Sequence, residues 1–135
     1  MRFDLLDSEM TLDESYLHVD EDELRARLAA YGRGDLRSFD VPVDYPDGLL
    51  GDVMRLMSAI PYGETRTYGD LAADLDSSAQ AVGQACGANP VPIVVPCHRV
   101  VAADGLGGFS AEGGTDLKRR LLALEAGESL ARFSD

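Results

Sequence analysis

The sequence has few cysteines, almost no lysine and no long apolar run. Its 135 residues contain two cysteines, Cys86 and Cys97, which are too few for a disulfide-stabilised scaffold. No secretory leader and no stretch of about 18 apolar residues is present, which argues against export and against a membrane span. We therefore expect a cytoplasmic protein with reduced thiols and no membrane partner. Its length fits one domain, or one domain with a small appendage.

Basic residues are scarce relative to acids. The chain holds 24 Asp and Glu against 12 Lys and Arg, a formal charge of −12, and Lys118 is its only lysine. Residues 1–47 carry 13 of the acids against 5 arginines, whereas residues 48–135 carry 11 acids against 7 bases. Taken alone, this balance argues against a nucleic-acid partner. An acid-rich, lysine-poor surface also suits a highly saline cytoplasm, where salt screens self-repulsion, and halophily is our hypothesis for it.

The patterning predicts a mixed α+β fold in two parts. These are a small acidic α/β segment over residues 1–46 and a mainly helical domain over residues 47–135. In the first part, the expected elements are weak strands at 2–6 and 15–19, a helix over 20–32 opened by a capping box of Asp20 and Glu23, and an edge strand at 39–44.

The second part begins with a core-facing helix and a pair of short helices. The expected helices cover residues 49–60, 68–75 and 77–87, the second capped by Thr67 and the third opened by a capping box of Ser77 and Gln80. Helix, tight turn and helix are the outline of a helix-turn-helix. The third helix has a face of small residues that would let a partner approach its backbone closely: Ala79, Val82, Gly83 and Cys86. Tight packing against a neighbouring helix is the alternative explanation.

The last third of the chain combines an apolar segment, a loop and a helix. Residues 89–101 are apolar but contain three prolines, which predicts a buried, extended crossing segment rather than a central strand. Residues 104–114 form a glycine-rich loop. A final helix is expected from its cap at Thr115 to Gly127. Glu125 lies on or beside the buried face of that helix, where a carboxylate needs a partner.

Cys97 is the candidate nucleophile. It lies between Pro96 and His98-Arg99, two potential cations that favour a thiolate. Because adjacent side chains of an extended segment point to opposite faces, His98 must reach the thiol through a turn or a water. Glu125 is a candidate to orient His98, which would complete a nucleophile, base and carboxylate set. The alternatives are a Cys97 that only packs in the core and a His98–Glu125 pair that is only structural. The spacing contains no paired-ligand motif, so we expect no metal site.

Five stretches carry a resemblance to a known family. They are IPYGETRTYGDLA at 60–72, AVG at 81–83, NP at 89–90 with PCHRV at 96–100, GGFS at 107–110, and residues 118–125. Together they are similar to the O6-alkylguanine-DNA alkyltransferases, also called methylated-DNA–protein-cysteine methyltransferases, and the Pro-Cys-His-Arg run is highly specific. The similarity covers about residues 40–127. Residues 1–39 do not match that family's usual amino-terminal domain.

The resemblance implies DNA repair by direct reversal, with no cofactor. Members of the family bind duplex DNA through the minor groove with the helix-turn-helix and flip the alkylated guanine out of the stack. They then transfer the alkyl group to a cysteine in one irreversible turnover. The matching roles fall on Cys97 as the acceptor, on His98 as the base acting through a water, and on Glu125 as the group that orients His98. We expect the protein to act as a monomer.

The resemblance also assigns residues that contact the substrate. Tyr68 matches a tyrosine that donates a hydrogen bond to the flipped base and crowds the phosphate, and Asn89 matches an asparagine that braces the helix-turn-helix and the cysteine segment. The main-chain carbonyls of Cys97 and Val100, and the amide of Ser110, match positions that read the guanine edge. The remaining candidates for contact with substrate or DNA are Thr67, Ala79, Gln80, Gly83, Arg99 and Lys118.

Two positions depart from the family pattern. Gln80 stands where the family usually has an arginine that fills the gap left by the flipped base, and Ala111-Glu112 look like an insertion in the loop after Ser110. An alternative function is therefore a non-catalytic module that binds DNA lesions, of the alkyltransferase-like type. Proteins of that type lack the cysteine, which this chain has at Cys97. A remoter alternative is an unrelated thiol hydrolase.

Overall fold

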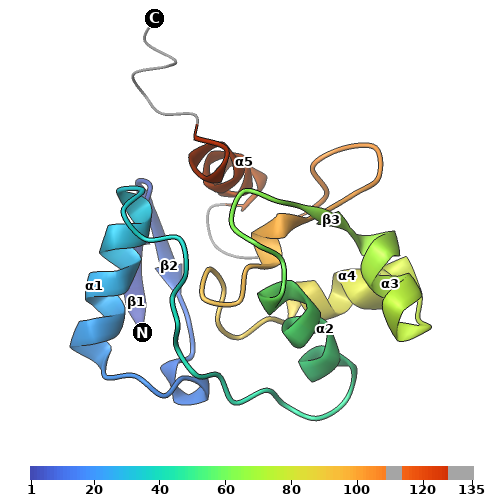
Figure 1. Ribbon diagram of the computed structural model, residues 1–135, viewed down its shortest axis with the longest axis horizontal. Helices are drawn as coiled ribbons and strands as arrows, with labels where there is room; N and C mark the ends of the chain where they lie inside the picture. Colours follow the sequence, from blue (N-terminus) through green and yellow to red (C-terminus); the bar gives the residue numbers. More distant parts are fainter. Residues whose placement is uncertain (109–113, 128–135) are drawn as a thin grey trace, which may run out of the picture.

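Five α-helices and two small two-stranded sheets make up the described chain. The structure, a computed structural model, describes residues 1–108 and 114–127 (Figure 1). In chain order the elements are β1 (Arg2–Leu5), β2 (Ser8–Thr11), the 3-10 helix η1 (Glu14–Tyr16), α1 (Glu21–Gly32), α2 (Leu49–Ser58), β3 (Arg66–Thr67), α3 (Tyr68–Leu75), α4 (Ala79–Gly87), the 3-10 helix η2 (Cys97–Arg99), β4 (Val100–Val101) and α5 (Gly114–Glu125). The mixed α+β class is confirmed. None of the described helices is long and apolar enough to cross a membrane.

The chain starts with a β-hairpin. β1 pairs antiparallel with β2, with Leu5 opposite Ser8, and the two turn residues Leu6 and Asp7 both have positive φ angles of 48° and 65°. Two left-handed residues in a two-residue loop give the turn that matches the twist of the strands. The expected strand at 2–6 is therefore confirmed. Its partner is β2, which lies closer in sequence than the nearest expected strand at 15–19.

The strands expected at 15–19 and 39–44 are wrong. Residues 14–16 form η1, which is capped by the side chain of Asp13, and the two segments meet only at an isolated bridge between Leu17 and Val43. Asp40 has a left-handed φ of 51°, and Pro42 has no amide hydrogen to donate, so a continuous ladder does not form there. Two backbone hydrogen bonds beside the bridge hold this crossing in place.

Helix α1 forms where its periodicity indicates. Asp20 caps it by accepting from the backbone amide of Asp22, and Leu24, Leu28 and Tyr31 are buried. Glu23 does not complete the expected capping box; it pairs with Arg27 instead. The helix packs against β1, so the N-terminal segment has its own layer of hairpin and helix.

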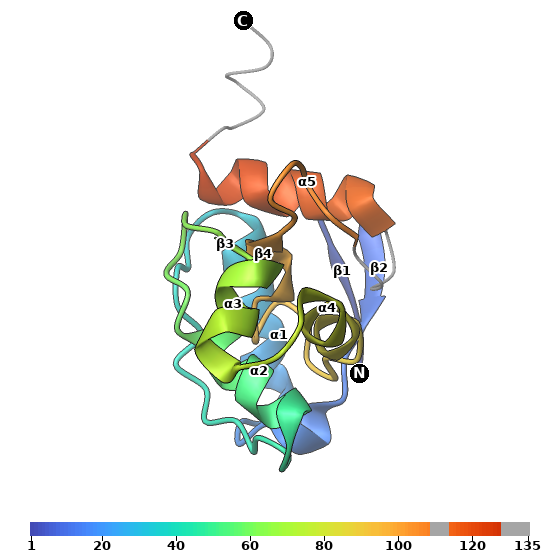
Figure 2. The same ribbon diagram turned by 90° about the vertical axis from the view of Figure 1, so that its right-hand side faces the viewer.

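Helices α2, α3 and α4 pack together on the opposite side of the molecule (Figure 2). Thr67 caps α3 in a reciprocal capping box with Asp70, as expected for the cap. Helix α4 is capped by Ser78, whose hydroxyl accepts from the amide of Ala81, so the expected capping box of Ser77 and Gln80 is wrong. The amide of Ser77 instead donates back to α3, because the chain turns at the left-handed Asp76.

The proline-rich segment is buried but not extended throughout. Ile93 has a φ of 77°, and the amide of Val95 bonds back to the carbonyl of Val91, so the chain makes a tight turn before η2. After η2, β4 pairs in parallel with β3. Helix α5 then crosses above both parts (Figure 1). It starts at Gly114, so Thr115 lies inside its first turn rather than at its cap.

The buried apolar side chains of both parts form one cluster. It extends from Leu5 and Leu28 in the N-terminal segment to Val53 and Met57 in α2 and Leu121 in α5. The boundary that we place near residue 47 stays a prediction, but the two parts are packed on a shared core. Burial of this core is the main favourable contribution to folding.

One glycine tests the close turn that leads into α2. A Cβ atom on Gly51 in α2 would lie 1.7 Å from the carbonyl oxygen of Pro46. Gly51→Ala should therefore lower the free energy of unfolding in urea by about 3 kcal/mol. Gly83→Ala is the matched control, because a Cβ atom there meets no described atom within 4 Å. We expect that control to be as stable as the parent, or up to about 1 kcal/mol more stable; equal stabilities of both variants would contradict the close contact.

Candidate active site

Cys97, His98 and Arg99 lie on the single turn η2, and all three are buried. Consecutive residues of a 3-10 turn are about 120° apart around its axis, so the three side chains point in three directions. The expected extended geometry, with His98 opposite Cys97, is replaced by this turn. The three side chains reach three different environments.

The thiol of Cys97 lies in an apolar environment with two polar neighbours. Burial raises the pKa of Cys97, while a hydrogen bond from the Asn89 side chain and the positive charge of Lys118 act in the opposite direction. From the sequence we expected His98 and Arg99 to be the cations beside the thiol. Lys118, from α5, is the cation that acts on it instead.

Lys118 is fully buried, and its ammonium group is held by main-chain oxygens. Nζ donates to the carbonyls of Val100 at 2.7 Å and Gly108 at 2.9 Å, and to the hydroxyl of Tyr68 at 3.4 Å. Burial lowers the pKa of Lys118, and the nearby thiols Cys97 and Cys86 raise it. The ammonium group of Lys118 therefore lies inside the site, and its expected contact with substrate or DNA stays a prediction.

The side chain of His98 is paired on one nitrogen only. Its Nε2 lies 2.7 Å from Oε2 of Glu125, and both side chains are buried. Its Nδ1 is also buried and has no hydrogen-bonding partner among the described residues. Burial lowers the pKa of His98, against the raising effect of Glu125, which favours a neutral imidazole. With the proton on Nε2 facing the carboxylate, Nδ1 carries a free lone pair.

Arg99 forms a bidentate ion pair with the same carboxylate. Its Nε and Nη2 donate to Oε1 and Oε2 of Glu125 at 2.7 and 3.0 Å, and Nη1 donates to the carbonyl of Ile60 at 2.7 Å. Burial would raise the pKa of Glu125, but the hydrogen bonds from His98 and Arg99 lower it to about 2. The guanidinium is buried and compensates this carboxylate, so the structure gives Arg99 a role inside the site, and its expected contact with substrate or DNA stays a prediction.

A third partner of Glu125 was missed in the sequence. The hydroxyl of Tyr31, from α1, donates to Oε2 of Glu125 at 2.5 Å and lies 3.3 Å from Nε2 of His98. Tyr31 lies on the apolar side of α1 with Leu24 and Leu28, and its ring is buried. The overlooked signal was the hydroxyl, because a fully buried tyrosine usually finds a hydrogen-bond partner.

Tyr68 and Asn89 stand on either side of the cysteine segment. Tyr68 is half-buried, and its hydroxyl donates to the carbonyl of Gly108 at 3.4 Å. The Asn89 amide donates to the carbonyl of Val95 at 2.8 Å and its oxygen accepts from the amide of Val91 at 3.1 Å. Asn89 follows the C-cap residue Ala88 of α4, so these bonds tie the end of α4 to the turn that leads to the cysteine.

The expected small-residue face of α4 is divided. Ala79 and Gln80 are exposed and Gly83 is half-buried, whereas Val82 and Cys86 belong to the core. Burial raises the pKa of Cys86 to about 12, and its Sγ lies 3.6 Å from Sδ of Met57. Ser110 and the insertion Ala111-Glu112 lie outside the described residues. Within the described part of the chain, no three His, Cys, Asp or Glu side chains come together as a metal site.

The sequence matches a family model described as "6-O-methylguanine DNA methyltransferase, DNA binding domain" over residues 50–127. The chain belongs to this methyltransferase family. A methylated-DNA–protein-cysteine methyltransferase of Mycolicibacterium paratuberculosis is 47% identical over 112 residues, which are 80% of this chain and 67% of that protein. One from Methanopyrus kandleri is 48% identical over 104 residues, which cover 76% of this chain and 78% of that protein.

Solved structures of the methyltransferase family agree with the fold. The OGT protein of Mycobacterium tuberculosis in complex with DNA is 41% identical, with a TM-score of 0.74 over 84% of this chain and 71% of that one. The O6-methylguanine-DNA methyltransferase of Pyrococcus kodakaraensis is 47% identical, with a TM-score of 0.53 over 56% of this chain and 44% of that one. The resemblance stated from the sequence motifs is thereby confirmed.

The ion pairs of Glu125 should give stability a distinct pH dependence. A carboxylate whose pKa falls from 4.5 to about 2 on folding stabilises the protein fully above about pH 4.5, and this contribution is lost as the pH falls toward 2. Glu125→Gln should lower the free energy of unfolding by about 3 kcal/mol at pH 7, with the difference from the parent shrinking in acid. The control Glu23→Gln breaks an exposed pair with Arg27 and should cost about 0.5 kcal/mol or less. A difference that stays constant from pH 7 to pH 2 would contradict the assignment.

Proposed function

We propose that the protein repairs DNA by direct reversal, moving the alkyl group of O6-alkylguanine to Sγ of Cys97 in one irreversible turnover. The observation that carries the proposal is the arrangement on η2. A buried thiol and a histidine with a free Nδ1 share one turn, and the other nitrogen of that histidine is held by Glu125. Family membership supports the same reaction.

The proposed reaction is a displacement at the alkyl carbon. His98 starts neutral and takes the thiol proton of Cys97 at Nδ1 through a water. The thiolate attacks in line, so the S–C bond forms as the bond from carbon to O6 breaks. The electron pair of that bond goes to the guanine, which takes up one proton in place of the proton that the thiol gave to His98, so His98 returns to neutral and the products are an S-alkyl cysteine and unmodified guanine. No cofactor takes part.

Lys118 and Asn89 favour the thiolate in this scheme. The ammonium group and the Asn89 side chain both oppose the effect of burial on the pKa of Cys97. The hydroxyl of Tyr68 accepts from Lys118 and donates to the carbonyl of Gly108, and in this scheme it exchanges the bond to Gly108 for one to the flipped base. The carbonyls of Cys97 and Val100 and the amide of Ser110 would form hydrogen bonds with the edge of the guanine. Thr67 positions Tyr68 by capping α3.

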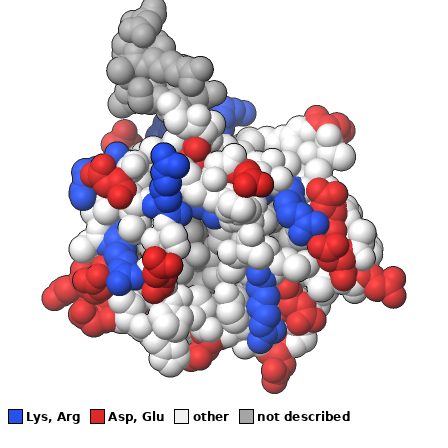
Figure 3. All heavy atoms as spheres, in the orientation of Figure 1, with Lys and Arg blue, Asp and Glu red and all other residues white. Residues whose placement is uncertain are grey.

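The proposed DNA-binding face is the side that carries α3 and α4. Residues 77–103 contain no Asp or Glu, and among the described helices α4 alone has no charged residue. Figure 3 shows acidic side chains on the side of the molecule where α3 lies, and Asp70, Asp74 and Asp76 in and directly after α3 are exposed, so the acid-free part of this face is α4. An uncharged helix does not repel phosphates, and the open space over Gly83 allows close approach to a minor groove. Action as a cytoplasmic monomer fits this substrate.

A non-catalytic lesion-binding module is the weaker alternative. Such a module needs the DNA-binding face but not a nucleophile with an oriented base. Here the base, its carboxylate and the thiol are all present and buried together. The chain also has the cysteine that alkyltransferase-like proteins lack. The catalytic function therefore explains the thiol, the base and the carboxylate, whereas a lesion-binding module explains none of the three.

Replacement of each cysteine tests the acceptor. When the protein is mixed with a duplex containing O6-methylguanine, intact-mass and peptide analysis should find one methyl group on Cys97. Cys97→Ser should keep DNA binding and abolish transfer, because a serine hydroxyl is a far weaker nucleophile. Cys86→Ser is the matched control and should transfer normally, since burial raises the pKa of Cys86 to about 12 and thus disfavours its thiolate. A methyl group on Cys86 would overturn the assignment.

Substitution of Gln80 tests base flipping. Gln80 is exposed in the first turn of α4 and has no capping role, so changes there should leave stability nearly intact. A side chain that enters the gap left by the flipped base recovers part of the unstacking cost, and arginine adds a planar cation that suits nearby phosphates. Gln80→Arg should therefore tighten binding to methylated duplex and speed transfer at low salt, with less advantage in molar salt. Equal single-turnover rates for the parent, Gln80→Arg and Gln80→Ala would mean that this side chain takes no part in flipping.

A further inference from the structure

We infer that Tyr31 is a positioning residue for alkyl transfer, through which the N-terminal segment of residues 1–46 keeps His98 neutral and correctly oriented. The inference rests on the proposed function of Cys97 and His98. It assigns a role to a segment that lies outside the matched family domain. The contact that carries it is the hydrogen bond from the Tyr31 hydroxyl to Oε2 of Glu125, the same oxygen that His98 uses.

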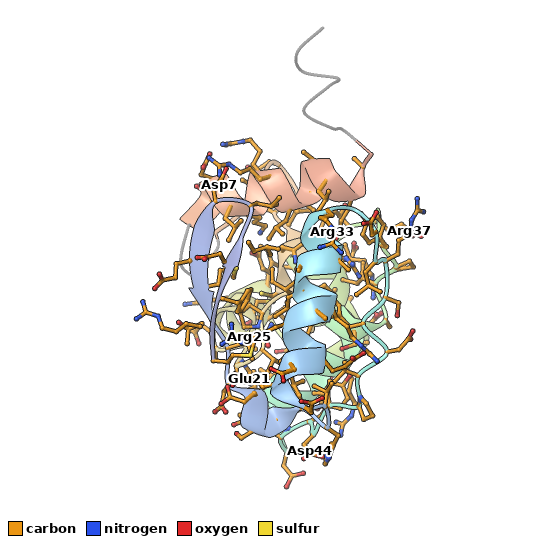
Figure 4. The ribbon with its side chains drawn as sticks, turned by 90° about the vertical axis from the view of Figure 1, so that its left-hand side faces the viewer. Asp7, Glu21, Arg25, Arg33, Arg37 and Asp44 are labelled. Atoms are coloured by element: carbon orange, nitrogen blue, oxygen red, sulfur yellow. The ribbon has the colours of Figure 1, made fainter. Side chains whose placement is uncertain are left out.

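Helix α1 delivers this hydroxyl from the inner side of the N-terminal segment. Figure 4 looks onto the outer side of α1, where Glu21 and Arg25 form an exposed ion pair at 3.3 Å. Tyr31 is fully buried, so it faces the opposite way, into the molecule. Its ring packs on Phe39 and lies edge-on to Tyr62 and His98, at centroid distances of 5.5, 6.3 and 6.4 Å. The ring is thus fixed on several sides, and the position of the hydroxyl is fixed with it.

The Tyr31 hydroxyl competes with His98 for one carboxylate oxygen. Oε2 of Glu125 accepts from Tyr31, from Nε2 of His98 and from Nη2 of Arg99. Oε1 accepts from Nε of Arg99 and from the amide of Gly63. Every donor to a carboxylate disperses its negative charge, so less of that charge acts on the imidazole. With Arg99 as its only other donor, Oε2 could still form a strong bond to a charged His98. The additional hydrogen bond from Tyr31 weakens that bond.

A neutral histidine is what the proposed reaction needs at its start. A base that is already protonated cannot take the proton of Cys97. The groups that act on His98 are Glu125, which raises its pKa, and Arg99 and Lys118, which lower it, in addition to burial. Burial and Glu125 raise the pKa of Tyr31, so its hydroxyl stays protonated and remains a donor. Without this donor, Glu125 should hold His98 in the charged form over a wider pH range.

A purely structural tyrosine would behave differently. Loss of a structural hydroxyl lowers stability and reduces the rate by a similar factor at every pH. Loss of a positioning hydroxyl changes the shape of the pH–rate profile, because the fraction of neutral His98 changes. The pH dependence of transfer and the titration of the imidazole therefore separate the two roles.

The test compares Tyr31→Phe with Tyr62→Phe in the full-length chain. Phenylalanine keeps the ring of each residue, and the Tyr62 hydroxyl reaches only the carbonyl of Leu124 at 3.5 Å among the described contacts. The two histidines of the chain, His18 and His98, make the imidazole signals simple to assign by NMR, with His18→Asn identifying the exposed one. The readouts are the His98 pKa and the single-turnover rate at saturating methylated duplex across pH.

We expect Tyr31→Phe to raise the His98 pKa and to slow transfer about tenfold at pH 7, with the rate recovering toward the parent as the pH rises. Tyr62→Phe should match the parent in both readouts.

A fluorinated tyrosine placed at position 31 keeps the shape of the side chain and is a stronger hydrogen-bond donor, so it should shift the His98 pKa downward. This third variant tests the inference even if Tyr31→Phe unfolds. An unchanged His98 titration and an unchanged pH–rate profile in Tyr31→Phe, or an unchanged titration with the fluorinated tyrosine, would overturn it. If the parent itself transfers no methyl group, the proposed function fails, while the titrations still decide the role of Tyr31.

Discussion

The carboxylate of Glu125 is the interaction on which the rest of the site depends. A buried charge is tolerated only when its hydrogen-bonding capacity is filled, and this one is filled by donors from distant parts of the chain. Tyr31 comes from α1, His98 and Arg99 come from η2, and the Gly63 amide comes from the loop after α2. Displacement of any of these elements removes a donor from the buried carboxylate. The orientation of the His98 ring beside Cys97 is therefore set by the whole fold rather than by the turn alone.

The distribution of charge explains how an acidic protein fits an anionic substrate. The composition argued against a nucleic-acid partner because it averages over the whole chain. The acids are absent from residues 77–103, which hold α4 and the cysteine segment, while the only lysine is buried beside the thiol. Electrostatic interactions between exposed charges fade within a Debye length, about 8 Å at physiological salt, so local charge matters more at a close contact than net charge. The positive charge of this lysine, Lys118, lies where it stabilises the thiolate of Cys97.

Local sequence signals predicted the helices. The features that they did not predict, namely the cap of α4 and the strand pairing, depend on tertiary contacts. The Thr67 cap and the periodicity of α1 and α2 involve residues three or four positions apart, so they could be identified from the sequence. The choice between Ser77 and Ser78 as the cap of α4 depends on where the left-handed Asp76 ends α3, which the sequence does not mark. The failed strands have the same cause, because a strand needs a partner and the partners were fixed by turns and by packing.

The same distinction separates the parts of the site that were predicted from those that were not. The pairing of His98 with Glu125 was foreseeable, because both residues lie in the matched motifs and a buried carboxylate needs a donor. The burial of Arg99 and Lys118 was not, since a basic side chain in a DNA-binding protein is more often on the surface. Tyr31 was the hardest to find, because it lies outside the motifs that carry the resemblance and its ring alone explains its burial. A segment held to the core by apolar packing can change much of its sequence and still serve the site, provided that it keeps one hydroxyl at the oxygen of Glu125 that His98 shares. In this chain, that requirement links the N-terminal segment to the chemistry, although the segment lies outside the matched DNA-binding domain.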